Sequence, residues 1–464
     1  MPTPPGDVVD RLERLAARAP VAPADPDLLW SRGRRRQGRR VAASLAGVAA
    51  AGVLATAVTP VALERLDRPV AAASTRMVLP DVLRTPGSWE PAFPATPVRL
   101  SAVGVGERSG LLSSTPSLWG VSAATGETRW LDLPDLVPAS HVPPELSADG
   151  RRVAYWVTGP TSGEPLGNGG PTRRGETEEV TPVVGVAVLD LATGAVVRWE
   201  IASEHGLSVN GLAWAGDVLW WMGGPLTSLG QGATSAELAT YTWDVTTDER
   251  LEVEGEAGGA GLTLSRAGDA PGGFVTLPRT FRLDRVTGAR ATGSSRVELP
   301  AGTPSSAGLT DPEMAPDGAT VAALVLADPT MYDATDEHDL VVGTRAGGVL
   351  TLQTVGGVRA QSVLGWRSPT EVVVSSPTAV DDDGLSTGQQ VWVVDVTTGE
   401  RTELLDVAGA LPDSVAAEAW AADVVDAPGA PFAPDPRVVG LGGMVVLVFC
   451  VSLWRDLRRR RGHA

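Results

Sequence analysis

The chain has 464 residues, of which 43% are hydrophobic and 20% charged, so it is long and apolar enough to bury a large core. Its single cysteine, Cys450, excludes an intramolecular disulfide and any zinc or iron–sulfur site built from several cysteines. The net charge is −17, and the absence of lysine excludes a phosphate-binding loop of the Walker type.

The charges are unevenly distributed along the chain. Residues 1–40 hold nine arginines and five acidic residues, and residues 455–464 hold five arginines and one acidic residue. Of the 38 arginines and 55 acidic residues in total, 24 and 49 therefore lie between these two ends. An acidic middle argues against nucleic acid as a partner and favours cations or basic partners.

Residues 1–40 are predicted to form a separate cytoplasmic leader. Asp7 can cap a short helix before a proline-rich stretch ends regular structure. One face of this helix is apolar, and a helix of about a dozen residues is marginal alone in water, so the face is predicted to contact a partner. The candidate partner-binding residues are Val8, Leu12 and Leu15.

Two uncharged segments flanked by arginines predict membrane spans. They cover residues 41–59 and 438–454, so that residues 60–97 become a proline-rich stalk, 427–437 a linker and 455–464 a basic cytoplasmic tail. The expected localisation is the cell membrane, with both termini cytoplasmic and the middle of the chain outside. The lipid bilayer is the expected partner of the arginines. The candidate membrane-surface residues are Arg34, Arg35, Arg36, Arg39, Arg40, Arg458, Arg459, Arg460 and Arg461.

Repeated turns define residues 98–426. In residues 186–199, two β-branched apolar runs flank Asp190, Thr193 and Gly194, a turn in which the carboxylate accepts a backbone N–H and glycine takes positive φ. Related turns recur every 40 to 68 residues, and a second hairpin type with Asp-Gly at its turn alternates with them. The related turns begin at Ser122, Asp244, Asp284, Gly343 and Asp395, and the Asp-Gly turns are clearest at Asp149 and Asp317. A repeat built wholly from strands and turns predicts a β-propeller.

A Pro-Asp-Gly hairpin followed by an Asp-x-x-Thr-Gly hairpin resembles the blade of WD-repeat and TolB-like propellers, and this resemblance covers residues 98–426. The predicted fold class is all-β, a six-bladed propeller, or a seven-bladed one if residues 98–112 begin an additional sheet. A strand within residues 415–425 is expected to pair with the blade that begins near Val98 and so close the ring. Tryptophans in the strands are expected to fill the wedges between neighbouring sheets.

No catalytic, cofactor or metal-binding constellation is recognisable, and the chain is predicted not to be an enzyme. Residues 384–388 match the G-x-S-x-G pattern, but a strand is expected after them, whereas a nucleophile elbow requires a helix. Residues 332–339 and 381–384 are acidic but lack the ligand spacing of a calcium loop. His141 and His205 are isolated and are predicted to be surface or core residues.

Two function classes remain. In the first, the propeller is a membrane-anchored extracytoplasmic binding or sensory module for an unknown ligand. The leader resembles those of membrane proteins associated with extracytoplasmic-function sigma factors in GC-rich bacteria, and this resemblance implies a cytoplasmic regulatory protein as a partner. The alternative is a membrane-anchored propeller enzyme that acts on glycan or peptide. We take the binding class as the main prediction.

Overall fold

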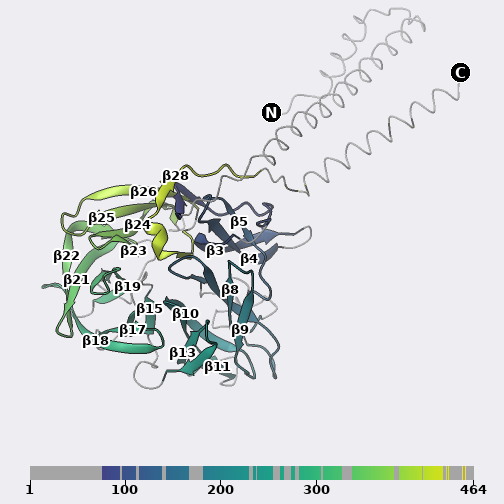
Figure 1. Cartoon of the computed structure of the whole chain (residues 1–464), viewed down its shortest axis with the longest axis horizontal. Helices are drawn as coiled ribbons and strands as arrows, with labels where there is room; N and C mark the ends of the chain where they lie inside the picture. The colour runs from purple at the N-terminus through teal and green to yellow at the C-terminus, as the bar shows by residue number, and fades with distance from the viewer. Residues whose placement is uncertain are drawn as a thin grey trace, which may run out of the picture. The chain divides into compact units, whose positions relative to one another are not determined.

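A computed structural model describes residues 76–437 with several gaps, together with Ser452 and Arg455 (Figure 1). The gaps are residues 95–96, 111–113, 138–142, 167–180, 229–233, 237, 254–261, 266–272, 277–281, 305–306, 327–336, 381–385, 410, 432–434 and 436. The chain divides into two compact units, residues 1–69 with 440–464 and residues 70–439. Every described strand belongs to the second unit.

The second unit consists of antiparallel meanders of four strands, which follow one another around a ring in Figure 1. Three meanders form sheets of their own. The first sheet contains β27 (Ser414–Val415), β3 (Leu100–Ser109), β4 (Ser114–Ser122) and β5 (Thr128–Leu131), and the second contains β6 (Glu145–Leu146), β7 (Arg152–Thr158), β8 (Val183–Asp190) and β9 (Val196–Glu200). The third contains β10 (Leu207–Ala215), β11 (Val218–Ser228), β13 (Ala239–Asp244) and β14 (Glu249–Glu252), with β12 (Thr234–Ala236) beside β11. The all-β propeller prediction is confirmed.

The remaining meanders lie between β14 and β27 in the chain. They are β15 (Leu262–Ser265), β16 (Gly273–Thr276), β17 (Arg282–Thr287) and β18 (Arg290–Glu298); β19 (Gly308–Met314), β20 (Thr320–Leu326), β21 (His338–Ala346) and β22 (Val349–Ala360); and β23 (Ser362–Ser368), β24 (Glu371–Val380), β25 (Ser386–Asp395) and β26 (Arg401–Ala408). The last of these meanders gains a fifth strand, β2 (Val82–Arg84), and β1 (Val78–Pro80) pairs with β28 (Asp423–Val425).

The predicted number of blades is wrong. The described strands form five sheets of four or more strands, neither six nor seven, because β18 and β22 pair in parallel and join two meanders into one eight-stranded sheet. Residues 296–298 supply this contact opposite residues 349–351. The turn pattern counts hairpins along the chain and carries no information on this edge-to-edge pairing. No additional sheet begins at residues 98–112, since β3 belongs to the sheet of β27.

The predicted turns are present at Ser122, Asp190, Asp244 and Asp395, whereas Asp284 and Gly343 lie within β17 and β21 and their hairpins turn at residues 288–289 and 347–348. Each lies between the third and fourth strands of a meander, as between β8 and β9, where the carboxylate of Asp190 accepts hydrogen bonds from Thr193 N at 2.8 Å and Thr193 Oγ1 at 2.9 Å. Gly194 follows with φ +70° and no atom within 4 Å of a Cβ placed there, so its φ, and not crowding, requires glycine. Asp395 accepts the same kind of bonds from Thr397 and Thr398.

These turn carboxylates make stability depend on pH. Burial tends to raise the pKa of Asp190, but hydrogen bonds from Thr193 outweigh it and the pKa lies below its usual value. Hydrogen bonds from Thr397 and Thr398 lower the pKa of Asp395. A carboxyl with a lowered folded-state pKa stabilises the fold above its unfolded pKa of about 3.9, and this contribution is lost as pH falls through the lower folded pKa.

We therefore expect the melting temperature to fall below about pH 4, and to fall less steeply in the double variant D190N/D395N, in which neither turn can titrate. Differential scanning calorimetry between pH 7 and pH 2.5 measures both slopes. D423N, whose carboxylate lies on exposed β28 outside any such turn, is the control and should keep the wild-type slope. Equal slopes for D190N/D395N and the wild type would contradict the turn assignment.

A C-terminal strand pairs with the first blade, as predicted, but it is β27 (Ser414–Val415), which shares only Val415 with the predicted range 415–425. Ser414 pairs with Val103 and Val415 with Ala102, after which α3 (Ala417–Trp420) interrupts the chain before β28. A second closure was not predicted: β2 pairs in parallel with β26, the outer strand of the last meander. Part of the range predicted as a stalk therefore pairs with propeller strands.

Tryptophans pack between the meanders, as expected, and several also link one meander to the preceding one. The indole of Trp214 on β10 donates to the Glu145 carbonyl at 3.4 Å, and that of Trp366 on β23 donates to the Glu313 carbonyl at 3.0 Å. Trp420 on α3 donates to the Leu364 carbonyl at 3.0 Å. These side chains fill the space between neighbouring sheets and also form a hydrogen bond to the preceding meander.

The predicted membrane location is contradicted in the described chain. No helix among the described residues is long and apolar enough to cross a membrane. The two predicted spans themselves, residues 41–59 and 438–454, lie outside the described residues except for Ser452.

Candidate functional site

The two ends of the propeller differ in the length of their connections. Within each meander, the turn between the first and second strands and the turn between the third and fourth strands lie at one end of the propeller. These turns are short, and those between β4 and β5, β8 and β9, and β21 and β22 hold at most five residues. The other connections lie at the opposite end, because successive antiparallel strands alternate in direction. They include the connections after β5, β7 and β20, of which residues 132–137, 143–144, 159–166, 181–182 and 337 are described. We name this end the long-connection face, and long connections on a rigid scaffold are where binding sites concentrate.

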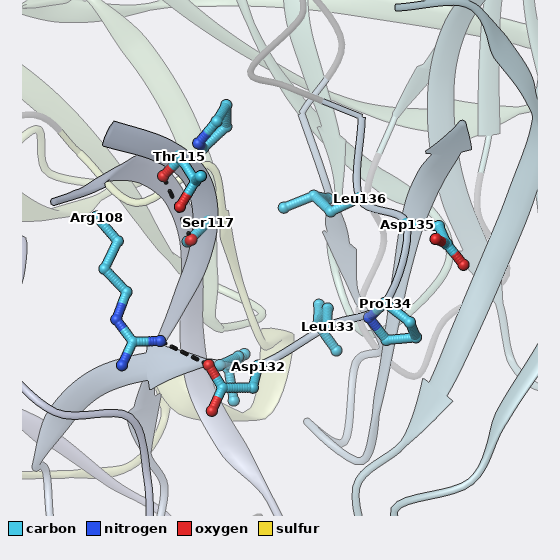
Figure 2. A pocket seen from close by; sticks show the side chains of 10 residues that line it. Arg108, Thr115, Ser117, Asp132, Leu133, Pro134, Asp135 and Leu136 are labelled. Atoms are coloured by element: carbon cyan, nitrogen blue, oxygen red, sulfur yellow. Dashed lines mark hydrogen bonds and ion pairs between the residues drawn. The ribbon is translucent and has the colours of Figure 1, made fainter. Parts of the chain in front are cut away.

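A pocket of about 570 Å³ lies on the long-connection face, a volume typical of small-ligand sites. The end of β3, the start of β4 and the connection that follows β5 form its walls. Figure 2 shows Leu136 pointing toward the strand that carries Thr115 and Ser117, whereas Asp135 points away from that strand. The ten lining residues are Arg108, Thr115, Pro116, Ser117, Leu131, Asp132, Leu133, Pro134, Asp135 and Leu136. We call this site the Arg108 pocket.

Two ion pairs fix the charges around the pocket. Arg108 Nη1 donates to Asp132 Oδ1 at 2.6 Å (Figure 2). Arg198 Nη2 donates to Asp135 Oδ2 at 2.5 Å. In both pairs the carboxylate is the more exposed partner: Asp132 is 75% exposed against 32% for Arg108, and Asp135 is 52% exposed against 31% for Arg198. An arriving ligand therefore meets carboxylates first.

The connection after β5 is anchored to the next meander. Thr158 N donates to the Asp135 carbonyl at 2.9 Å, Leu136 forms a bridge with Val157, and Asp135 itself has φ +54°. Beneath it, the hydroxyl of Tyr155 donates to the Pro134 carbonyl at 3.4 Å. Burial raises the pKa of Tyr155 to about 12, with Arg198 acting to lower it and Asp135 to raise it, so the hydroxyl stays protonated. Aspartate is among the few non-glycine residues that tolerate positive φ.

The start of β4 presents an open strand edge inside the pocket. β5 pairs with β4 only from Leu118 onward, so residues 114–117 have β3 on one side and the pocket on the other. Ser122 N donates to Glu127 O, which places the peptide groups of even-numbered residues on the β5 side. Pro116 therefore offers an acceptor but no donor to the pocket, and proline is suited to such an edge.

The described pocket residues contain no activated nucleophile. The hydroxyl of Ser117 donates to the Thr115 carbonyl at 3.4 Å, and within the described chain neither hydroxyl is bonded to a carboxylate or an imidazole. Among the described residues, no three His, Cys, Asp or Glu side chains are grouped so that they could hold a metal ion.

A smaller hollow of about 170 Å³ lies between α3 and the inner strands β19 and β23. Trp366 and Trp420 line it, and both indoles are bonded to backbone carbonyls. Glu418 also lines it, but this carboxylate is paired with Arg99. The hollow is part of the ring closure.

The residues singled out in the sequence do not form this site. All candidate partner-binding and membrane-surface residues lie outside the described residues, as do His141 and residues 381–383. His205 has Nδ1 2.7 Å from the Glu164 carbonyl, away from the Arg108 pocket lining. Ser386 begins β25, so a strand follows the G-x-S-x-G match, as predicted. The one sequence signal that points toward the pocket is the contrast between long and short connections.

No protein-family model matches the chain, and no curated protein matches its sequence. Solved structures match at low identity. An oligogalacturonate lyase from Vibrio parahaemolyticus is 12% identical, with 70% of this chain and 78% of that chain covered and a TM-score of 0.41. A puromycin hydrolase is 14% identical, with 69% and 50% covered and a TM-score of 0.37. The propeller domain of the Trilobed protease from Pyrococcus furiosus is 12% identical, with 72% and 97% covered and a TM-score of 0.31.

These similarities concern the fold, and the chain spans half the length of the puromycin hydrolase it matches. The resemblance of the propeller to WD-repeat and TolB-like families, and that of the leader to membrane proteins associated with sigma factors, remain predictions. The neighbours include a lyase, a hydrolase and a protease domain, so the prediction that the chain is not an enzyme is contradicted by the comparison and is withdrawn. Membrane anchoring and sensing gain no support from it.

Proposed function

We propose that the propeller binds a peptide substrate in the Arg108 pocket, as the recognition part of an enzyme that acts on peptides. The observation that carries this proposal is the exposed Asp132 carboxylate, 75% accessible, beside a wall formed by Leu133 and Leu136. Such a pocket suits a basic side chain next to an apolar one. The open edge of β4 runs alongside and offers the Pro116 carbonyl to a peptide backbone.

Charge favours a basic ligand over an acidic one. Arg108 is already paired with Asp132 and is the more sheltered of the two, so an acidic side chain would first meet a carboxylate. The acidic charge of the whole chain, −17, would steer cations toward the surface. A glycan is the less favoured ligand, since none of the ten lining residues is aromatic and no sugar ring could stack there.

The proposal is tested with short peptides that contain leucine followed by lysine, glutamine or glutamate, measured by fluorescence polarisation. We expect the lysine peptide to bind best and D132N to weaken it about tenfold, the effect of losing one hydrogen bond to a charged group. D217N is the matched control, because Asp217 is also the exposed partner of an arginine, Arg152, but lies outside the pocket. Equal affinities for the three peptides, or equal losses in D132N and D217N, would refute the proposal.

A further inference from the structure

The outer strands of the propeller differ in what covers their free edges. β26 is covered by β2, β18 and β22 cover each other, and Trp130 at the edge of β5 forms a bridge with Ala92. In the described chain, only β9 and β14 have no strand or bridge beyond them. On β9, the Arg198 carbonyl accepts a hydrogen bond from Arg250 Nη2 at 3.0 Å, which occupies part of that edge. β14 is left as the open edge.

Every residue of β14 is exposed, and Leu251, at 44%, is among the few large hydrophobic residues exposed in the described chain. Val253 N donates to Thr240 O, so alternate peptide groups, those of Glu249 and Leu251, face β13. The peptide groups of Arg250 and Glu252 therefore face outward. No described residue bonds to them, and they could pair with an added strand.

The charges on this edge are of one sign. Arg250 is directed back toward the protein: its guanidinium donates to Asp248 Oδ1 at 2.7 Å and lies 5.0 Å from the Trp243 ring centroid. The carboxylates of Glu249 and Glu252 have no such partner among the described residues. Because side chains alternate between the two faces of a strand, Glu249 lies beside Leu251 on one face and Glu252 beside Arg250 on the other, so the edge presents one apolar side chain and two negative ones.

We propose that β14 is a docking edge for a basic, extended segment of another protein, which adds to the sheet as an antiparallel strand. Cross-strand pairing requires a basic residue opposite Glu252, an apolar residue opposite Leu251 and a basic residue opposite Glu249. In a two-fold antiparallel pair centred on Leu251, a second copy would set Arg250 opposite Glu252, but Arg250 is already bonded to Asp248, and two chains of net charge −17 repel each other. The arginine run at residues 32–40 lacks an apolar residue to place opposite Leu251. This site is separate from the Arg108 pocket, and the inference does not rest on the proposed function.

The test uses the full chain and a fluorescent peptide with the core Lys-Val-Thr-Lys, followed by polarisation at 0.05 M and 0.5 M salt. In an antiparallel register, the first lysine and the threonine would bond to the outward groups of Glu252 and Arg250. We expect N-methylation of these two residues to reduce affinity at least tenfold, and N-methylation of the valine and the second lysine to leave it within twofold. Added salt should weaken binding.

Substitutions on the protein provide the second arm. Glu252→Pro removes an outward backbone donor while the bonds to β13 remain, so its melting temperature should be unchanged. Its affinity for the peptide should be at least tenfold lower than that of Glu252→Ala, which lacks the carboxylate but keeps the donor. D132N should have no effect, which separates this edge from the pocket. Equal binding of both N-methylated peptides would overturn the proposal. So would a wild-type dimer in sedimentation that Glu252→Pro converts to a monomer, since the edge would then be occupied by a second copy.

Discussion

Replacing residues 414–425 with a glycine–serine linker of equal length is expected to leave no cooperatively folded propeller at 25 °C. This segment contains β27, α3 and β28, and it closes the ring through several contacts at once. Ser414 Oγ accepts a hydrogen bond from Leu146 N at 3.0 Å, and Glu418 N donates to Ala148 O at 3.1 Å, so the segment reaches the second meander as well as the first. Its loss would open the edge of β3 to solvent.

The size of the effect depends on the side chains that the segment buries. Trp420 is 2% exposed, and losing a buried tryptophan side chain costs about 3–5 kcal/mol by itself. Whole domains are stable by only about 5–15 kcal/mol, so the added loss of strand pairing approaches the total. Calorimetry and near-UV circular dichroism measure the outcome. A linker of equal length over residues 427–430, which follow β28, is the control and should preserve the transition. A closure-replaced protein that melts within 5 °C of the wild type would contradict this account.

Local turn chemistry made the hairpins predictable from the sequence. An aspartate that accepts from the backbone two or three residues on, followed by a residue with positive φ, determines a turn with few other contacts. This holds for Asp190 and Asp395, whose turns lie where the pattern placed them. The closure at β27 was predictable for a related reason, because a ring of sheets leaves its first meander in need of a strand.

The features that sequence reasoning missed depend on which chain segments meet. The parallel contact of β18 with β22 and that of β2 with β26 join strand edges far apart in the chain, and no residue type marks such an edge. The Arg108 pocket forms because β5 ends at Leu131, opposite Leu118, so the first residues of β4, which begins at Ser114, have no β5 partner. The positive φ of Asp135 then directs the connection toward the second meander. Aspartate occurs in many conformations, so its sequence position alone could not reveal this bend.

Tryptophans with and without a hydrogen-bond partner are expected to differ in how much a phenylalanine substitution lowers the free energy of unfolding. Trp366 and Trp221 are both buried, at 5% and 0% exposure, and replacing either with alanine should cost about 3–5 kcal/mol in the free energy of unfolding. Trp221 packs against its neighbours by ring contacts: it stacks on Tyr241 at 4.3 Å and meets Trp156 edge to face at 5.8 Å. Its indole nitrogen has no hydrogen-bond partner among the described residues.

Phenylalanine separates the two roles. W221F keeps a stacked ring and loses no hydrogen bond, whereas W366F also removes the donor to the Glu313 carbonyl. We expect W366F to cost about 0.5–1.5 kcal/mol more than W221F, the net contribution of one hydrogen bond. Urea unfolding at pH 7, with equal m-values required for comparison, measures this difference. If W221F proves as costly as W366F, ring packing alone holds the meanders together, and the bonds between inner strands contribute nothing measurable to the ring.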